Sequence, residues 1–239
     1  EHDTRRHFPG AAAVKCVQIT DLHLNALMPF HREFIRRINA IRPDFIFFTG
    51  DMIDRRKNLS LLEEFLENFD PQSAKAAILG NWEHWGKVET GEMRDLYERF
   101  GIDLIVNDAK IYSVGEKRIL ISGVDDFISG DPDIQKALSA YQPNDFHIVL
   151  SHCPGYVDMI RQAIAPAKKA DLILSGHTHG GQISLFGFVP ILPVGSGGYV
   201  KGWYPHPAGP LYVSRGIGTT IVPLRFSAQA EISIFNLYL

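Results

Sequence analysis

Seven side chains of the types that bind divalent metal ions stand out in this 239-residue chain by their positions. Carboxylates, an amide and imidazoles offer the mixed oxygen and nitrogen ligands that suit manganese, iron or zinc. Seven ligands are too many for one ion, so we expect two ions with the Asp51 carboxylate as their bridge. Such a pair lowers the pKa of a shared water molecule and holds a phosphoryl group for in-line attack. The candidates are Asp21, His23, Asp51, Asn81, His152, His177 and His179.

The candidates share a position in the chain, because each comes just after a run that predicts a strand. Short apolar runs indicate strands over residues 14–20, 44–49, 74–79, 147–150 and 172–174. Helical spacing covers residues 31–41, 59–69, 92–100, 131–141 and 156–164. In the early part this alternation predicts parallel strands. The carboxyl ends of such strands form the edge where α/β proteins place their sites, so we expect the candidates to lie together.

The later part of the chain is organised differently, as strands separated by loops rich in Gly and Pro. Residues 111–114 and 118–122 lie on either side of Gly115-Glu116, which predicts an antiparallel hairpin. Further strands end with a last one over residues 231–239, and we expect mostly hairpins there. The two parts together predict an α/β fold, with a two-layer β core and helices outside. A composition of 45% hydrophobic and 21% charged residues fits one globular domain.

Charge and cysteine content exclude several classes of protein. The net charge of −3 argues against a broad nucleic-acid-binding surface, which needs clustered positive charge. No run of 18 apolar residues is present, so the sequence predicts no membrane-spanning segment. The two cysteines, Cys16 and Cys153, cannot make a disulfide framework, and neither belongs to a Cys-x-x-Cys pair.

Five short motifs, taken together, resemble those of the calcineurin-like metallophosphoesterases. They are Asp-x-His at 21–23, Gly-Asp at 50–51, Gly-Asn at 80–81, Ser-His at 151–152 and Gly-His-Thr-His at 176–179. The resemblance implies a four-layer α/β/β/α sandwich over residues 14–239, with two mixed sheets and flanking helices. Residues 1–13 would be an N-terminal extension, compatible with an anchor removed before Glu1. The resemblance also implies one metal ion on Asp21, His23, Asp51 and His179, and a second on Asp51, Asn81, His152 and His177, with manganese preferred.

Three further stretches look like a bacterial membrane-associated branch of that family, which includes UDP-2,3-diacylglucosamine hydrolases. They are GHTHGGQ (176–182), LYVSRGIG (211–218) and AEISIF (230–235). This likeness implies a lipid-linked phosphodiester or pyrophosphate substrate, with UDP-2,3-diacylglucosamine cleaved to UMP and lipid X as the specific expectation. It also implies a protein on the bacterial inner membrane, at its cytoplasmic face. The alternatives are a phosphodiesterase or phosphatase acting on another substrate, and a non-catalytic metal-binding scaffold.

Trp82 departs from the family pattern, in which a His that contacts the scissile phosphate follows the Asn. An indole N–H donates a hydrogen bond but cannot supply a proton. Three explanations follow. The chain is a non-catalytic scaffold, or His84 is the general acid in place of the missing His, or the leaving group needs no general acid. The last case fits a pyrophosphate, because the phosphate monoester that it releases has a second pKa of about 6. A purely structural contact between Trp82 and Trp85 remains a further explanation.

Several other residues are candidates for substrate contacts. Arg55 and Arg56 follow the Asp51 loop and Arg215 stands beside Gly216, so each is placed to meet a phosphate; a solvated surface run is the alternative for the first two. The apolar run 183–193 is a membrane or acyl-chain contact if it is exposed, and core if it is buried. Trp203 and Tyr204 would suit a membrane interface. The pair at 125–126 either orients metal ligands or forms a turn.

Overall fold

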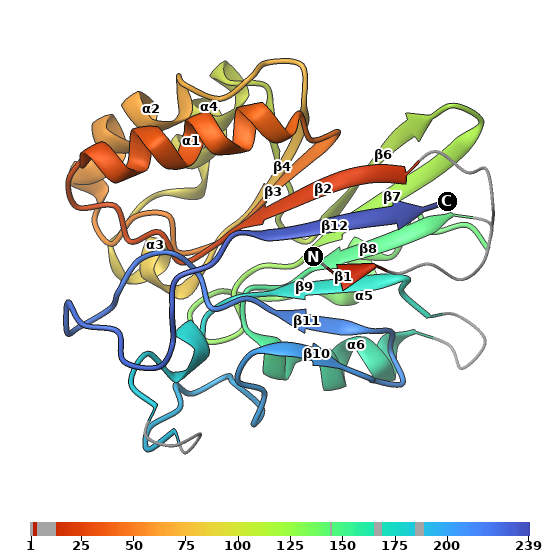
Figure 1. Cartoon of the computed structure of the whole chain (residues 1–239). Coiled ribbons are helices and arrows are strands. Elements are labelled where there is room, and N and C mark those ends of the chain that lie inside the picture. Colours follow the sequence, from red (N-terminus) through yellow and green to blue (C-terminus); the bar gives the residue numbers. More distant parts are fainter. Residues whose placement is uncertain (1, 4–12, 144, 165–168, 185–188) are drawn as a thin grey trace.

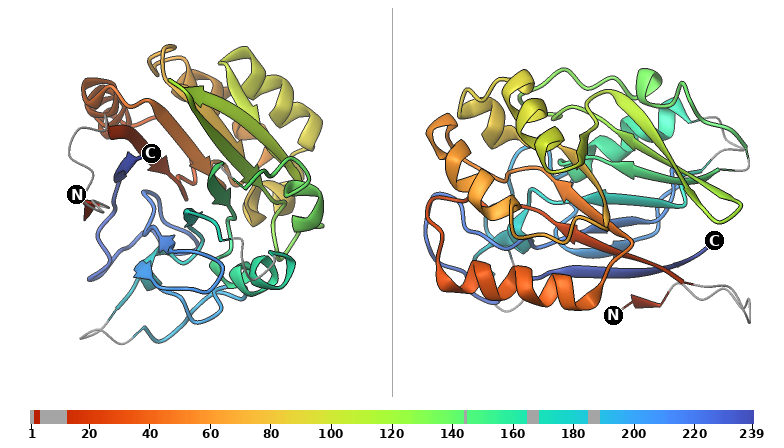
Figure 2. Two further views of the ribbon diagram at one scale, coloured as in Figure 1. Left: turned by 90° about the vertical axis from the view of Figure 1, so that its right-hand side faces the viewer. Right: turned by 90° about the horizontal axis from the view of Figure 1, so that it is seen from above.

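Strands that are buried on both faces read as continuous apolar runs, and the fold is built around such strands. The computed structural model describes residues 2–3, 13–143, 145–164, 169–184 and 189–239. Two six-stranded sheets pack face to face, with helices on their outer faces (Figures 1 and 2). Every residue of β3 (Phe45–Thr49) is buried, as expected for a strand between two layers. The predicted arrangement of two mixed sheets with flanking helices is confirmed.

The first sheet contains the early parallel strands and the last strand of the chain. Its order is β1 (His2–Asp3), β12 (Ser233–Tyr238), β2 (Ala13–Ile19), β3, β4 (Ala74–Ile78) and β5 (Ile102–Leu104). The strands from β2 to β5 run parallel, whereas β12 pairs antiparallel with β2. The last strand therefore crosses to the other layer instead of forming the expected hairpin with its predecessor.

The second sheet is mixed in the same way. Its order is β10 (Gly202–Tyr204), β11 (Leu211–Val213), β9 (Leu172–Ser175), β8 (Phe146–Leu150), β7 (Lys117–Gly123) and β6 (Asp108–Val114). The strands β7, β8, β9 and β11 run parallel, and an antiparallel strand lies at each edge. The predicted hairpin around Gly115 is the β6–β7 pair.

Three hydrophobic clusters hold the layers together. The central cluster joins the facing sides of the two sheets, for example Phe47 of β3 and Ile148 of β8. On the outer face of the first sheet lie α1 (Pro29–Ile41), α2 (Leu59–Leu66) and α4 (Thr90–Arg99), and on that of the second lie α5 (Ile134–Ala137) and α6 (Val157–Ala163). Among the described residues, none of the helices is both long and apolar enough to cross a bilayer.

One predicted helix is much shorter than its spacing indicated. Residues 131–141 form only the four-residue helix α5. The Asp133 side chain accepts a hydrogen bond from the Lys136 backbone N–H, which fixes the first turn after Pro132. The Ser122 hydroxyl donates to the Ala137 carbonyl (2.7 Å), an acceptor that a longer helix would use internally. The proposed extension over residues 1–13 lies almost wholly outside the described residues.

Candidate metal centre

Five segments at one edge of the two sheets carry the seven candidate ligands. These segments follow β2 (Asp21, His23), β3 (Asp51), β4 (Asn81, the first residue of a short helix), β8 (His152) and β9 (His177, His179). The seven residues are all buried, with exposed fractions of 5% or less. The expectation that strand ends would bring these residues together therefore holds.

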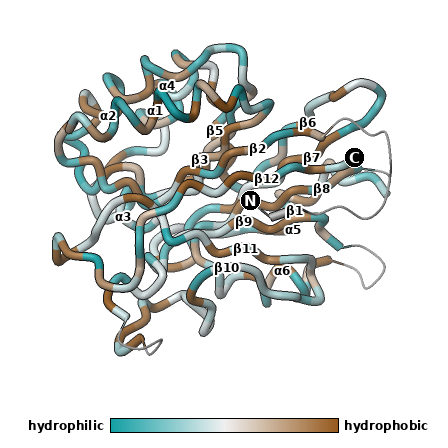
Figure 3. The backbone as a smooth tube through the Cα atoms, in the orientation of Figure 1, coloured by the Kyte–Doolittle hydropathy of each residue, from teal (hydrophilic) through white to brown (hydrophobic). Residues whose placement is uncertain are grey.

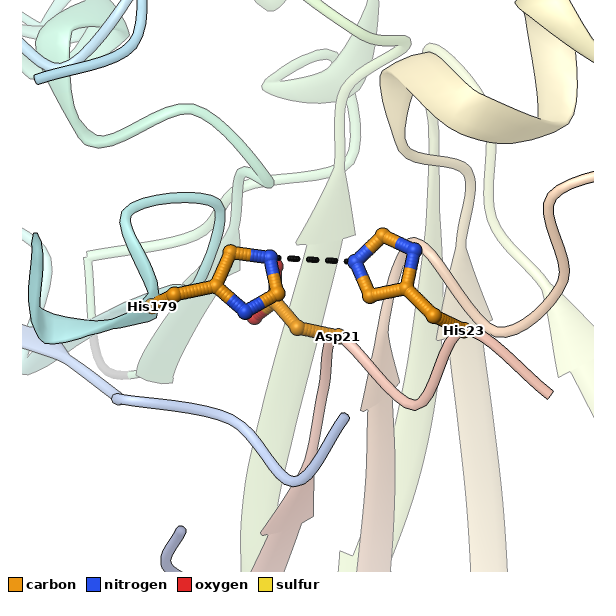
Figure 4. Close-up of side chains that lie close together, drawn as sticks. All are labelled: Asp21, His23 and His179. Atoms are coloured by element: carbon orange, nitrogen blue, oxygen red, sulfur yellow. Dashed lines mark hydrogen bonds and ion pairs between the residues drawn. The ribbon is translucent and has the colours of Figure 1, made fainter. Parts of the chain in front are cut away.

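The first group of side chains consists of Asp21, His23 and His179 (Figure 4). The Nε2 atoms of the two imidazoles lie 3.0 Å apart, and His179 Nε2 lies 3.5 Å from Asp21 Oδ1. One ligand atom from each of the three residues falls within 4.8 Å of the others. That spacing places three donor atoms around a single point.

The second group consists of Asp51, His152 and His177, whose ligand atoms also lie within 4.8 Å of one another. His152 Nε2 is 3.1 Å from Asp51 Oδ2, and His23 Nε2 of the first group is 3.8 Å from that same oxygen. The Asp51 carboxylate thus stands between the two groups, in the position that the predicted bridging role requires.

The donor atoms of the second group fit a cation. Asn81 Oδ1 and His152 Nε2 are buried without a hydrogen bond in the described structure, although His152 Nε2 lies 3.1 Å from the Asp51 carboxylate. Burying a polar atom without a partner costs free energy, and a divalent ion would satisfy both atoms. His152 donates from Nδ1 to the Thr49 carbonyl (2.8 Å), which leaves the Nε2 lone pair for a metal ion. His177 donates from Nε2 to the Val194 carbonyl (2.7 Å), which leaves Nδ1.

Burial and the neighbouring carboxylates act in opposite directions on the four ligand imidazoles. Burial lowers the pKa of His177, whereas Asp54 and Asp51 outweigh burial and raise the pKa of His23, and Asp51 does the same for His152. A divalent ion bound beside these two imidazoles would displace their protons.

Burial lowers the pKa of His179 to about 4, so this imidazole is neutral at pH 7. Burial alone would raise the pKa of Asp51, but the adjacent imidazoles of His152 and His23 outweigh it and hold this pKa below its usual range. The bridging candidate is therefore a carboxylate at neutral pH.

The backbone at the candidate ligands is strained. Five of the seven have positive φ angles: Asp21 (51°), His23 (48°), Asp51 (54°), His177 (72°) and His179 (51°). A residue other than glycine in this region costs on the order of 1 kcal/mol. Strain concentrated on these residues indicates that their side-chain directions matter more than local stability.

The glycines of the motifs allow the loops to approach one another closely. A Cβ atom at Gly80 would collide with Asp51 Oδ1, and one at Gly176 would collide with Asp21 Oδ2 and the Thr20 side chain. The Gly-Asn and Gly-His motifs therefore combine a ligand with the one residue that leaves room for a neighbouring ligand.

Glu83 is a positioning residue that the sequence analysis missed. It lies in α3 (Asn81–Trp85), is 1% exposed, and accepts hydrogen bonds from four backbone N–H groups. The donors are those of Gly80 (2.8 Å), Asp51 (2.9 Å), Met52 (2.6 Å) and Ile53 (3.2 Å). Burial and the Asp51 charge raise the pKa of Glu83 to about 7. This carboxylate holds the loop of one ligand against the loop of another.

Two more positioning residues contact ligand imidazoles from outside. Asp54 Oδ1 lies 2.5 Å from His23 Nδ1, which directs His23 Nε2 toward the first group. The guanidinium of Arg225 lies 3.2 Å from His179 Nδ1 and donates to the Arg215 and Gly218 carbonyls (2.9 and 2.7 Å). Asp54 stands three residues after Asp51, a signal that the sequence offered, whereas Arg225 lies too far along the chain to be found by spacing.

Trp82 lies against the first group of ligands. Its ring meets that of His23 edge-on at 5.7 Å between centroids, and meets that of Trp85 at 5.3 Å. Its backbone N–H donates to Asp51 Oδ1 (2.9 Å). The indole thus forms a wall beside the candidate ligands, and the contact with Trp85 that the sequence analysis considered is present as well.

That wall belongs to a groove of about 400 Å³. Asp51, Asn81, His177 and His179 line one part of it. Thr178, Gln182 and Thr220 add polar groups to the lining. Most of the other lining side chains are apolar: Trp82, Trp85, Ile183, Pro190, Ile191, Pro193, Ile221 and Val222. The run 183–193 is thus partly exposed, with Ile191 80% exposed, although residues 185–188 lie outside the described residues.

The other predicted contacts lie elsewhere or have partners already. His84 Nε2 is 2.8 Å from Asp125 Oδ1, and His84 is not among the described residues that line the groove. Arg215 pairs with Glu231 and Arg56 pairs with Glu92, whereas exposed Arg55 has no recorded partner in the described structure.

Two further predictions from the sequence can be placed in the fold. Trp203 is half-buried in β10 and packs against the rings of Tyr212 and Phe235. Asp126 accepts hydrogen bonds from the backbone N–H groups of Ile128 and Ser129 (2.9 and 2.7 Å), so it forms a turn. It also accepts from the thiol of Cys153, the residue after His152.

The fold and this centre define a metal-dependent phosphoester hydrolase. The chain belongs to the calcineurin-like phosphoesterase family, whose model matches residues 14–181. The uncharacterized metallophosphoesterase YkuE of Bacillus subtilis (strain 168) is 34% identical over 240 residues, covering 95% of this chain and 80% of its own. A metallophosphoesterase of Helicobacter pylori (strain ATCC 700392 / 26695) is 28% identical, covering 94% and 60%.

Solved structures share the fold at low sequence identity. The protein TT1561 of Thermus thermophilus has a TM-score of 0.57 at 11% identity and covers 86% of this chain and 90% of its own. The sulfate thiohydrolase SoxB of Thermus thermophilus has a TM-score of 0.55 at 13% identity, covering 97% and 58%. The relatives named above are not called UDP-2,3-diacylglucosamine hydrolases, so the comparisons give the family and its chemistry but not the substrate.

Proposed function

We propose that this metallophosphoesterase hydrolyses a phosphodiester or pyrophosphate that carries a long apolar group. UDP-2,3-diacylglucosamine is the specific candidate, with UMP and lipid X as products. The observation that carries the proposal is the groove, in which candidate ligands such as Asp51 and Asn81 lie beside a mostly apolar wall. A small polar phosphate ester would leave these apolar side chains exposed to water, whereas an acyl chain would bury them.

The groove is also large enough to hold part of such a substrate. Its volume of about 400 Å³ lies within the range of ligand sites, roughly 300–1,000 Å³. The remainder of a long chain would extend past Ile191 and Ile221, which are 80% and 91% exposed. Large apolar side chains exposed beside an active site usually mark a binding surface.

The residues of the chain would divide the chemistry as follows. Two divalent ions, manganese by preference, would lower the pKa of a water molecule and neutralise charge on the phosphoryl oxygens. Asp21, His23, Asp51 and His179 would hold one ion, and Asp51, Asn81, His152 and His177 the other. Glu83 and Asp54 keep these ligands oriented, and Trp82 excludes solvent from the side of His23.

The position of Trp82 favours a leaving group that needs no proton. The phosphate monoester released from a pyrophosphate is a stable anion, because its second pKa is about 6. His84 remains the alternative acid, and it would first have to leave Asp125. Arg55 has no recorded partner in the described structure, so we propose it as a diphosphate contact ahead of Arg56 and Arg215, which are held by carboxylates.

Hydrolysis of two matched pyrophosphates tests this proposal. The manganese-loaded protein should release UMP from UDP-2,3-diacylglucosamine with a kcat/KM at least 100-fold above that for UDP-N-acetylglucosamine, which lacks the long chains. Asn81→Ala, which removes a candidate ligand, should abolish release. Equal kcat/KM values for both substrates would show that the enzyme does not recognise the apolar group, which would contradict the proposal. Turnover of bis(p-nitrophenyl) phosphate alone would favour a phosphodiesterase with another substrate, and no turnover of any ester would favour a metal-binding scaffold.

A further inference from the structure

Exposed apolar side chains gather around the mouth of the groove. Of the twelve large hydrophobic residues that are exposed in the described structure, seven lie in three segments at this edge. We call them the apolar rim: Trp85, Ile191, Val194, Ile221, Val222, Leu224 and Phe226. In Figure 3, hydrophobic stretches lie at the tip of the loop next to α3 and along the loop at the bottom of the view. The two loops are residues 189–200 and 219–226.

Hydrogen bonds from Gln182 fix the backbone of the 219–226 loop, whose apolar side chains are exposed. Gln182 donates from Nε2 to the carbonyls of Thr220 and Val222 (both 2.9 Å), and its Oε1 accepts from the Thr220 N–H (2.9 Å). Its own carbonyl accepts from the Phe226 N–H (2.8 Å). The side chains of this loop are therefore exposed by a fixed scaffold, although collapse onto the protein would bury them.

Arg225 braces the same loop from inside. Its guanidinium donates to the carbonyls of Gly218, Ala228 and Arg215 (2.7, 3.1 and 2.9 Å) while its neighbours Leu224 and Phe226 are 54% and 52% exposed. The one cation of the loop thus points inward and the apolar residues point outward. This is the reverse of an ordinary surface loop.

Charge is absent from the rim. Residues 189–200 and 219–224 contain no Asp, Glu, Lys or Arg. A protein partner is usually recognised by polar groups around an apolar centre. Aliphatic loop tips flanked by Trp85 and Phe226, with backbone hydrogen bonds already made, instead suit the interface of a bilayer.

We infer that the apolar rim docks onto a lipid surface and presents the groove to it. Ile191, Ile221 and Val222 belong to both the rim and the groove lining, so the rim adjoins the mouth of the groove. The benefit of docking rests on the proposed function, in which the groove takes an apolar substrate group. An apolar substrate group would then pass from the bilayer into the groove without crossing water. Docking requires no anionic lipid, since the rim offers no cation.

Vesicle co-sedimentation of the full chain tests the inference. The wild-type protein should bind phosphatidylcholine vesicles, and binding should persist in 0.5 M NaCl. Leu224→Asn/Phe226→Asn, which changes rim residues outside the groove lining, should weaken binding at least tenfold and leave turnover of bis(p-nitrophenyl) phosphate unchanged. The matched control is Ile111→Asn/Phe127→Asn, at positions 42% and 39% exposed, and it should bind like the wild type.

Three results would overturn the inference. They are no binding to neutral vesicles, binding that needs anionic lipid and disappears in salt, or a dimer that only the rim variant dissociates, which would make the rim a contact between two copies. Vesicle binding is measured without turnover, so a failure of docking and a failure of the proposed hydrolysis are seen separately.

Discussion

Replacing Glu83 with Gln should destabilise the protein far more than its small change in shape suggests. Oε2 of Glu83 accepts from the N–H groups of Asp51 and Gly80, and Oε1 accepts from those of Met52 and Ile53. An amide keeps one oxygen and turns an NH₂ group toward the other two donors. Each buried donor left without a partner costs about 1–3 kcal/mol, so the expected loss is about 2–6 kcal/mol.

Urea denaturation at pH 8 measures this loss. Because the pKa of Glu83 is raised only to about 7, the wild-type side chain is ionised at that pH. Glu92→Gln is the matched control, since it is an equally conservative change at a side chain that is 32% exposed and paired with Arg56. A Glu83→Gln variant whose stability changes no more than that of the control would refute the role assigned to this carboxylate.

The remaining predictions concern orientation, pH and the leaving group. Asp54→Asn should weaken binding of one metal ion about 10–100-fold, measured by competition with a chelator, because His23 loses the carboxylate that orients it. Burial lowers the pKa of His147 to about 4, so its contribution to stability is complete above pH 6.5 and is lost as the pH falls toward 4. Urea denaturation at pH 8 and pH 5 should show that His147→Asn removes about 2 kcal/mol of this pH dependence; an unchanged difference would contradict the assignment. Trp82→His should speed hydrolysis of esters with alkoxide leaving groups by about 100-fold and leave pyrophosphates unaffected, and equal gains on both would sink the leaving-group argument.

The candidate ligands could be predicted because their positions follow from local rules. A short apolar run predicts a strand, and parallel strands bring their carboxyl ends to one edge, so Asp51 and His152 were expected to meet although 101 residues separate them in the sequence. Gly-Asn and Gly-His pairs added a signal, because glycine permits the close approach that Gly80 and Gly176 show.

Contacts that depend on the tertiary arrangement could not be predicted. Arg215 looked free beside a glycine loop, but the crossing of β12 to the first sheet places Glu231 against it. Helix α5 is short because the Ser122 hydroxyl, on strand β7, donates a hydrogen bond to the Ala137 carbonyl. The groove wall also joins α3 to loops beyond residue 180, and no spacing in the sequence links these segments.

The number of metal ions bound per chain tests the central claim most directly. Elemental analysis of the manganese-loaded protein after gel filtration should give two ions for the wild type, and one each for His179→Ala and Asn81→Ala. Asp51→Asn should lower the affinity for both, because its carboxylate stands between the two groups. A wild-type protein that retains one ion or none, or single variants that both retain two, would contradict the dinuclear centre on which the proposed hydrolysis depends.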